Sequence, residues 1–170
     1  IVRDKITANT VWWGEINKEF DSIKFDALYN KVTTYLSRGR IYVRDAFAGA
    51  SIDNRLSVRI IGTQSWHNLF CKNMFIEPSE EEFSSFKTDF TVITAPGFKA
   101  NPSIDGTESE NFAIINFSKK IILIGGTGYT GETKKGIFSV LNFVLPQKKK
   151  ILSMHCSANK GIDGDTAIFF

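Results

Sequence analysis

Two adjacent lysines follow a glycine-rich turn, which itself follows the apolar run IILI. In the stretch GGTGYTGETKKGIFSVLN, Lys134 and Lys135 fall at the start of an expected helix. Cations there oppose the helix dipole by roughly 0.3 to 1 kcal/mol each, and they stand beside backbone N–H groups that have no partner in the helix. A bound anion would relieve this concentration of positive charge. The pattern therefore favours an anion site, although two exposed and merely tolerated lysines also fit it.

Tyr129 and His155 extend this candidate site. Tyr129 lies in the same turn, where a packed ring is the alternative interpretation. His155 falls in the run ILSMHCSA, which we expect to be a strand. The ends of neighbouring parallel strands meet at one edge of a sheet, so this would bring His155 close to Tyr129 and the lysines. A histidine, a lysine and a helix N-terminus form a plausible site for a metal and an anion, but two ligands are few without a carboxylate.

The same turn matches one nucleotide motif and fails another. Gly126, Gly128 and Gly131 satisfy G-x-G-x-x-G, which raises an NAD(P)-dependent oxidoreductase as an alternative. That fold needs an acidic residue about 20 residues further on to hold the ribose, whereas the next expected strand ends in residues 156–158, CSA. The phosphate-binding pattern G-x-x-x-x-G-K-[ST] fails because Glu132 occupies the lysine position. The motif alone supports neither class well.

Helices and strands alternate through the rest of the chain. A helix capped by Asp21 and Ser22 and ending near Gly39 places four apolar residues on one face: Phe25, Leu28, Val32 and Leu36. Ser79 and Glu82 form a capping box for a short helix. Further helices are expected at 65–75, with Trp66, Leu69 and Phe70 facing inward, and at 131–145. Strands are expected at 41–44, 55–62, 89–94, 112–117, 119–124, 151–158 and 166–170, with a loop at 45–54. The predicted fold is α/β, a mixed β-sheet with flanking helices.

Composition limits the function classes. The 170 residues, 42% of them hydrophobic, predict one domain over 1–170. A net charge of +3 does not imply nucleic acid. Cys71 and Cys156 lack the spacing of a disulfide framework or zinc site and fit a reducing compartment. No run reaches the ~18 to 20 apolar residues that span a bilayer, and there is no signal peptide, so we expect a cytoplasmic protein without membrane partners.

Several longer motifs resemble one family. The stretches WWGEIN, RDAFAGAS, WHNLFCKNMF, PGFKANPSIDGTESENFAIINF, GGTGYTGETKKGIFSVLNFVLP and MHCSANKGIDGD occur in the order found in ATP-dependent phosphoenolpyruvate carboxykinase. The resemblance covers essentially the whole chain. It implies the N-terminal domain of that fold, as a fragment without the nucleotide-binding loop and the C-terminal domain.

The resemblance also implies a reaction and its residues. Oxaloacetate and ATP give phosphoenolpyruvate, CO2 and ADP in gluconeogenesis, a carboxy-lyase reaction with Mn2+ at the substrate and Mg2+ on the nucleotide. Matched by motif, Lys134 and Lys135 would be catalytic, and Lys135 and His155 would bind the metal and lie close to ATP. Tyr129 and Lys135 would contact the substrate, Tyr129 at its carboxylate or the departing CO2. Lys135 can bind a metal only as the neutral amine.

The resemblance implies that three parts of the family's site fall outside this chain. They are an arginine in a Gly-Arg-Ser-Pro motif before Ile1, the ATP loop after Phe170, and a later metal-binding aspartate. We therefore expect the isolated chain to be inactive, and a non-catalytic domain that binds small anions remains the second hypothesis. His67 is interpreted as structural, and Cys156 as a packing residue rather than a nucleophile.

Overall fold

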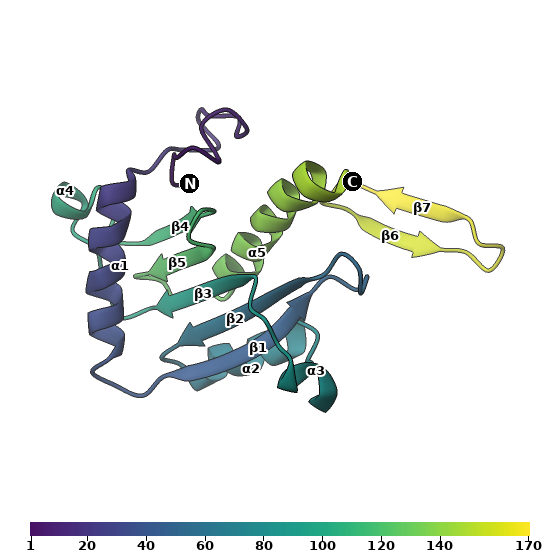
Figure 1. Ribbon diagram of the computed structural model, residues 1–170, viewed down its shortest axis with the longest axis horizontal. Helices are drawn as coiled ribbons and strands as arrows, with labels where there is room; N and C mark the ends of the chain where they lie inside the picture. Colours follow the sequence, from purple (N-terminus) through teal and green to yellow (C-terminus); the bar gives the residue numbers. More distant parts are fainter.

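A five-stranded mixed sheet forms the centre of the protein (Figure 1). The computed structural model describes residues 1–170. The strand order is β1-β2-β3-β5-β4, in which β2, β3 and β5 are parallel and the outer strands β1 and β4 run antiparallel to their neighbours. The strands are β1 (Tyr42–Ala48), β2 (Leu56–Gly62), β3 (Phe90–Ala95), β4 (Phe112–Asn116) and β5 (Ile121–Gly125). The prediction of an α/β fold with a mixed sheet is confirmed.

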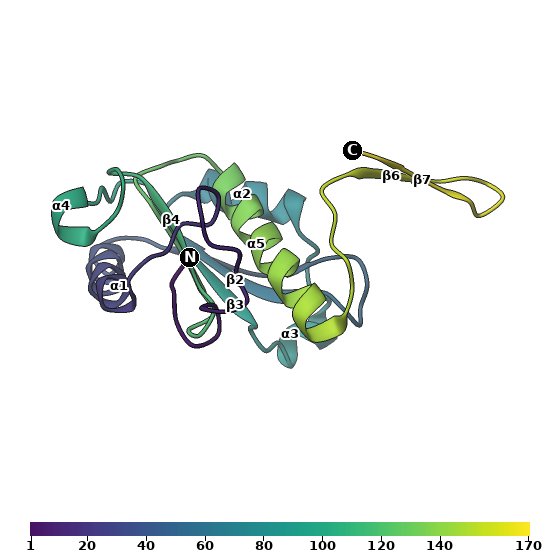
Figure 2. The same ribbon diagram turned by 90° about the horizontal axis from the view of Figure 1, so that it is seen from above.

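Helices cover both faces of this sheet (Figures 1 and 2). Helix α1 (Ser22–Leu36) packs on one face, and α2 (Ser65–Met74) and α5 (Gly131–Val144) pack on the other. Alternate residues of each strand point to opposite faces, so Leu123 of β5 packs with α1 while its neighbour Ile122 packs with α5. Two separate hydrophobic clusters result. Shorter elements are α3 (Glu80–Ser84), α4 (Pro102–Asp105) and a π-helical turn, η1 (Leu145–Lys149).

Local signals in the sequence explain several elements directly. The Asp21 carboxylate accepts hydrogen bonds from the N–H groups of Ile23 and Lys24, and the four apolar residues expected on one face of α1 are all buried. The capping box between Ser79 and Glu82 forms at the start of α3. Strands β4 and β5 pair antiparallel through the turn at Ser118. The predicted cap and apolar face of α1 and the predicted capping box of α3 are confirmed.

The expected loop at 45–54 begins too early. Strand β1 continues to Ala48, and residues 46–48 are buried. Asp45 lies opposite Arg59 of β2, and the guanidinium donates two hydrogen bonds of 2.7 Å to the two carboxylate oxygens. A charged residue therefore stays within the strand because its cross-strand neighbour carries the opposite charge.

The predicted inward face of α2 is also wrong. His67 and Cys71 are its buried residues, whereas Trp66 and Leu69 are 50% and 58% exposed. Phe70 is partly buried against the core. The hydrophobic pattern failed here because a polar residue, His67, takes the inward position and finds hydroxyl partners there.

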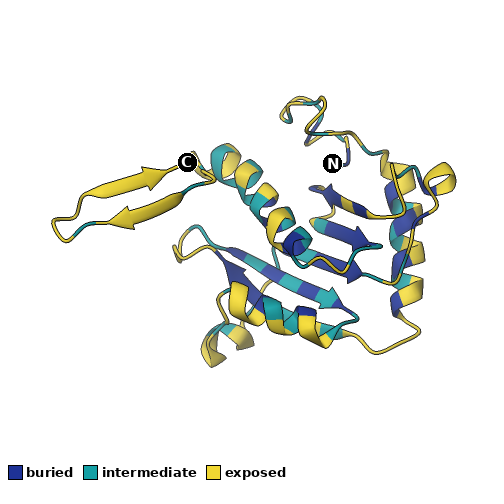
Figure 3. Ribbon diagram, turned by 180° about the vertical axis from the view of Figure 1, so that it is seen from behind, coloured by how far each residue is buried: buried dark blue, intermediate teal, exposed yellow.

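The end of the chain forms a separate two-stranded ribbon. Strands β6 (Ser157–Lys160) and β7 (Thr166–Phe169) pair antiparallel with each other and with no strand of the main sheet. Every residue of both strands is exposed, and the ribbon projects away from the helices (Figure 3). Residues 151–156, expected to begin a strand, have no regular structure. The predicted strand at 151–158 is therefore wrong for residues 151–156. Its last two residues belong to β6, which pairs with β7 and not with β5.

The two cysteines should differ strongly in reactivity. Both are free thiols, Cys71 buried and Cys156 partly exposed. Burial raises the pKa of the Cys71 thiol to about 11, which keeps it protonated and unreactive at neutral pH. Under iodoacetamide at pH 8, mass spectrometry should find Cys156 modified and Cys71 protected until denaturant is added. Equal modification of both thiols in the native protein would contradict this packing of α2.

No helix in the structure combines the length and the apolar character needed to cross a membrane.

Candidate metal and anion site at the start of helix α5

The carboxyl ends of three parallel strands lie at one edge of the sheet. The pairing of Gly62 with Thr94 and of Ala95 with Gly125 aligns the ends of β2, β3 and β5. Helix α2 begins shortly after β2 and helix α5 shortly after β5. Two helix N-termini therefore lie near this edge, which is where α/β sheets of this open kind usually bind ligands.

The turn between β5 and α5 depends on its glycines. Gly126 has φ +76°, and a Cβ atom there would lie 2.6 Å from the carbonyl oxygen of Glu110. A side chain would therefore be both strained and crowded. The Tyr129 ring lies directly over Gly131, where a methyl group would overlap it. Tyr129 itself is 69% exposed, so its ring is not buried in the core.

Lys134 and Lys135 are exposed at the start of α5. The nine ion pairs of the chain use other cations, so neither lysine has a carboxylate partner. The side chain of Thr130, the N-cap residue, makes no capping hydrogen bond. Two unpaired ammonium groups thus stand beside an uncapped helix N-terminus, an arrangement that attracts anions.

The structure brings His155 to Lys135. The Nζ atom of Lys135 lies 3.2 Å from Nε2 of His155, although His155 belongs to no strand of the main sheet. Its segment runs back along α5 after η1 (Figure 2). Phe138, three residues after Lys135, supports the pair: its ring centroid is 5.4 Å from that of His155 and 5.7 Å from the Lys135 ammonium. Sequence reasoning missed Phe138, although the i, i+3 spacing from Lys135 places both on one helix face.

The chemistry of these two nitrogens fits a divalent metal. A charged lysine amine has donors and no acceptor, so in the 3.2 Å contact Nζ donates and the ring nitrogen Nε2 of His155 accepts. Once the amine loses its proton, both atoms carry lone pairs, and nitrogen ligands bind such ions at about 2 Å. Two nitrogens 3.2 Å apart can both reach one ion at that distance. No group of three or more His, Cys, Asp or Glu side chains in the chain is placed to hold a metal.

A buried polar cluster lies behind the lysines. Nε2 of His67 is 3.0 Å from Oγ1 of Thr133, and Nδ1 is 3.4 Å from Oγ1 of Thr94. Burial lowers the pKa of His67 below its ordinary value, because the protein interior disfavours the charged ring. His67 therefore links α2 to the start of α5, a contact that the sequence pattern did not reveal.

The buried His67 predicts a pH-dependent stability. Its folded-state pKa is below that of the unfolded chain, so the unfolded state binds more protons in mild acid. The stability that depends on neutral His67 is complete above pH ~6.5 and is lost as the pH falls below that value. Urea unfolding at pH 7.5 and pH 5.5 should show a smaller free energy at pH 5.5, and His67→Gln should reduce the difference. An equal pH dependence in His67→Gln would refute this.

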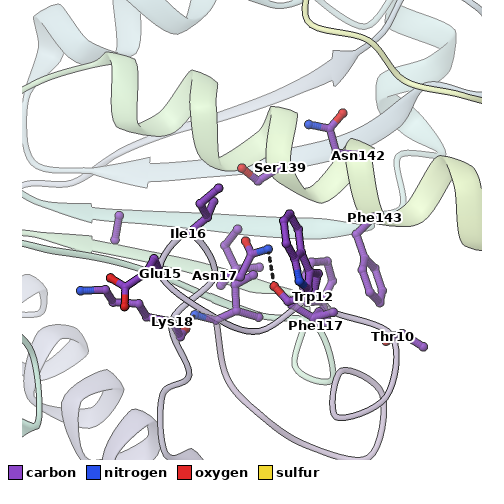
Figure 4. Close-up of a pocket in the computed structure, with 14 residues that line it drawn as sticks. Thr10, Trp12, Glu15, Ile16, Asn17, Lys18, Phe117, Ser139, Asn142 and Phe143 are labelled. Carbon is purple, nitrogen blue, oxygen red and sulfur yellow. Dashed lines mark hydrogen bonds between the residues drawn. The ribbon is translucent and has the colours of Figure 1, made fainter.

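A large open cavity lies elsewhere. It measures about 660 Å³ and separates the N-terminal segment from β4 and α5 (Figure 4). Trp12, Phe117 and Phe143 give it apolar walls, and Asn17 donates a hydrogen bond to the carbonyl of Trp12. None of Tyr129, Lys134, Lys135 or His155 lines it.

The strand order of the sheet differs from that of a dinucleotide-binding fold. In that fold a parallel strand follows the helix of the glycine motif and joins the same sheet. Here the neighbours of β5 are β3 and the antiparallel β4, both of which precede α5, and β6 pairs only with β7. The G-x-G-x-x-G match therefore lacks its structural context.

Comparison with known proteins identifies the family. The family model described as phosphoenolpyruvate carboxykinase matches residues 1–170. The chain is 61% identical over its full length to phosphoenolpyruvate carboxykinase (ATP) of Christiangramia forsetii, 52% to that of Amoebophilus asiaticus and 51% to that of Geobacter metallireducens. It spans about a third of the length of these curated relatives, 32%, 33% and 32% respectively. This chain belongs to the ATP-dependent phosphoenolpyruvate carboxykinase family.

Proposed function

We propose that this chain is part of a cytoplasmic ATP-dependent phosphoenolpyruvate carboxykinase, which converts oxaloacetate and ATP into phosphoenolpyruvate, CO2 and ADP. The observation that carries the proposal is the 3.2 Å contact between Lys135 and His155 beside an uncapped helix N-terminus, in a chain that belongs to this family. Mn2+ at the substrate and Mg2+ on the nucleotide are the proposed cofactors. The chain is proposed to be one domain, 1–170, of the N-terminal part of the enzyme.

The reaction is difficult because negative charge accumulates. Loss of CO2 leaves an enolate, whose oxygen must then attack the γ-phosphate of ATP in line. When bound, Mn2+ supplies Lewis-acid stabilisation of the enolate oxygen. The neutral amine of Lys135 and Nε2 of His155 would hold the ion, since these atoms are 3.2 Å apart and both exposed. His155 would also lie close to the γ-phosphate.

The remaining groups act on the substrate. Lys134 has no carboxylate partner and would draw anionic oxaloacetate and ATP towards the site. The exposed Tyr129 hydroxyl would donate a hydrogen bond to the substrate carboxylate or to the departing CO2. The free N–H groups at the start of α5 add positive character at the same place.

A chimera tests the proposal. The 170 residues replace the matching third of the Christiangramia forsetii relative, to which they are 61% identical. The chimera should form phosphoenolpyruvate from oxaloacetate in an ATP-dependent manner, as the parent does, and the isolated chain should form none. A folded chimera without activity beside an active parent would exclude the proposed function for this chain. Turnover by the isolated chain would show that the segment is sufficient, contrary to the proposal.

A non-catalytic domain that binds small anions is the second candidate, favoured by the unpaired lysines alone. It predicts that inorganic phosphate binds the isolated chain and that Lys134→Ala or Lys135→Ala abolishes this binding. Under this candidate, Mn2+ would not bind at Lys135 and His155 in the chimera, which electron paramagnetic resonance can decide.

A further inference from the structure

His67 occupies the junction of three elements that meet at the candidate site. It lies in the first turn of α2, and it contacts Thr133 in the first turn of α5 and Thr94 near the carboxyl end of β3. All three residues are buried, with exposed fractions of 6%, 0% and 2%. Polar side chains this deep in a core stay there only when they satisfy one another.

One arrangement of protons satisfies the whole cluster. Oγ1 of Thr94 lies 3.3 Å from the carbonyl oxygen of Ile61, which can only accept, so the Thr94 hydroxyl donates to it. The same Oγ1 then accepts from Nδ1–H of His67. Nε2 of the neutral ring keeps its lone pair and accepts the hydroxyl proton of Thr133. The imidazole therefore has a donor side towards β3 and an acceptor side towards α5.

This cluster fixes the turn that carries the two lysines. Thr133 directly precedes Lys134 and Lys135, and the N-cap residue of α5 offers no side-chain hydrogen bond. The hydrogen bond between the buried Thr133 hydroxyl and His67 thus ties the first turn of α5 to the rest of the protein. A second contact comes from the same turn of α2, since the Trp66 ring lies against the glycine loop at Gly128, 3.8 Å from where a Cβ would be.

We propose that His67 is a positioning residue of the carboxykinase site: through Thr133 it sets the place of Lys135 relative to His155. The inference rests on the proposed function. Lys135 and His155 are 20 residues apart, and they meet at the N-terminal end of a helix that has no side-chain cap. A ligand pair must be held within about 0.5 Å by its surroundings if it is to bind a metal well. His67 supplies this support from the opposite side of the helix turn.

The test uses three variants in the chimera with the Christiangramia forsetii relative. Thr133→Val removes the hydroxyl at nearly constant volume, His67→Leu removes both ring nitrogens, and His67→Gln keeps a donor and an acceptor. Val32→Ala is the control, because Val32 is a fully buried residue of α1, which packs on the other face of the sheet, and its loss can lower stability without touching α5. Two properties are measured well below the melting temperature: Mn2+ affinity by electron paramagnetic resonance, and amide hydrogen exchange of the peptide that covers 131–138.

Thr133→Val and His67→Leu should speed exchange in this peptide about tenfold and weaken Mn2+ binding about tenfold, the usual range for losing a group that orients a metal ligand. His67→Gln should recover most of both effects, and Val32→Ala should show neither. Unchanged exchange at 131–138 in Thr133→Val overturns the inference, as does an equal loss of Mn2+ affinity in Val32→Ala.

Lys135→Ala separates this inference from the proposed function. If that variant binds Mn2+ as tightly as the unmodified chimera, the ligand assignment fails. The exchange rates at 131–138 still decide whether His67 and Thr133 hold the first turn of α5, because exchange does not depend on the metal.

Discussion

Replacing Lys135 with alanine in the chimera is expected to lower the rate of phosphoenolpyruvate formation by about 10²- to 10³-fold, the usual loss when one preorganised electrostatic group is removed from an active site. The physical reason is the place of the amine: it lies 3.2 Å from Nε2 of His155 and has no competing carboxylate. The variant loses one of the two proposed metal ligands. Steady-state kinetics and Mn2+ titration both measure the effect.

Two further variants show what the amine does. Lys135→Arg keeps the positive charge, but a guanidinium remains protonated in proteins and has no lone pair for a metal. If Lys135 is a ligand, arginine should be nearly as damaging as alanine. If Lys135 acts only by its charge, arginine should retain much of the activity, and the ligand assignment would be wrong. Lys148→Ala is the matched control, because Lys148 is an exposed lysine in the turn that follows α5, and its loss should leave turnover unchanged.

Much of the fold could be predicted because it depends on local patterns. Helix α1 carries its own start signal at Asp21 and an unambiguous apolar face, so neighbouring elements add little to its definition. Strands β4 and β5 are consecutive apolar runs joined by a short turn, the simplest way to make an antiparallel pair. In both cases, the residues that determine the structure lie within one short segment.

The errors arose where a distant partner decided the outcome. The strand β1 continues through Asp45 because Arg59 stands opposite it, and no pattern within residues 41–48 reveals that pair. His67 faces inward because Thr94 and Thr133, 27 and 66 residues away, provide hydrogen bonds. Burying a polar ring without partners would cost about 1–3 kcal/mol, so its orientation depends on the tertiary structure.

The candidate site contains residues placed by local sequence and a residue placed by a distant contact. The lysines and the glycine turn form one continuous stretch, so their placement at the start of α5 could be predicted. His155 was also expected near them, but for a reason that the structure contradicts: it lies in an irregular segment instead of at the end of a strand in the main sheet. Its contact with Lys135 depends on the return of the chain along α5 and on the ring of Phe138.

The second large predicted effect is a loss of stability when the hydrophobic core is disrupted. Phe25→Ala should reduce the free energy of unfolding by about 3–5 kcal/mol, the usual cost of removing a buried phenylalanine. The ring is fully buried between α1 and the sheet, in the cluster that includes Ile93 and Leu123. This is a large fraction of the roughly 5–15 kcal/mol that holds a typical domain folded.

Ile23→Ala on the same helix is the matched control for this prediction. Ile23 lies two residues before Phe25, also has a large apolar side chain, and is 79% exposed. Its replacement should change the free energy of unfolding by less than about 0.5 kcal/mol, as surface substitutions usually do. Urea denaturation followed by circular dichroism compares the two variants directly. If both lose the same free energy, α1 does not pack on the sheet through Phe25. A large loss in Phe25→Ala alone shows that burial against β3 and β5, rather than helix propensity, holds α1 in place, because both variants gain the same residue in the same helix.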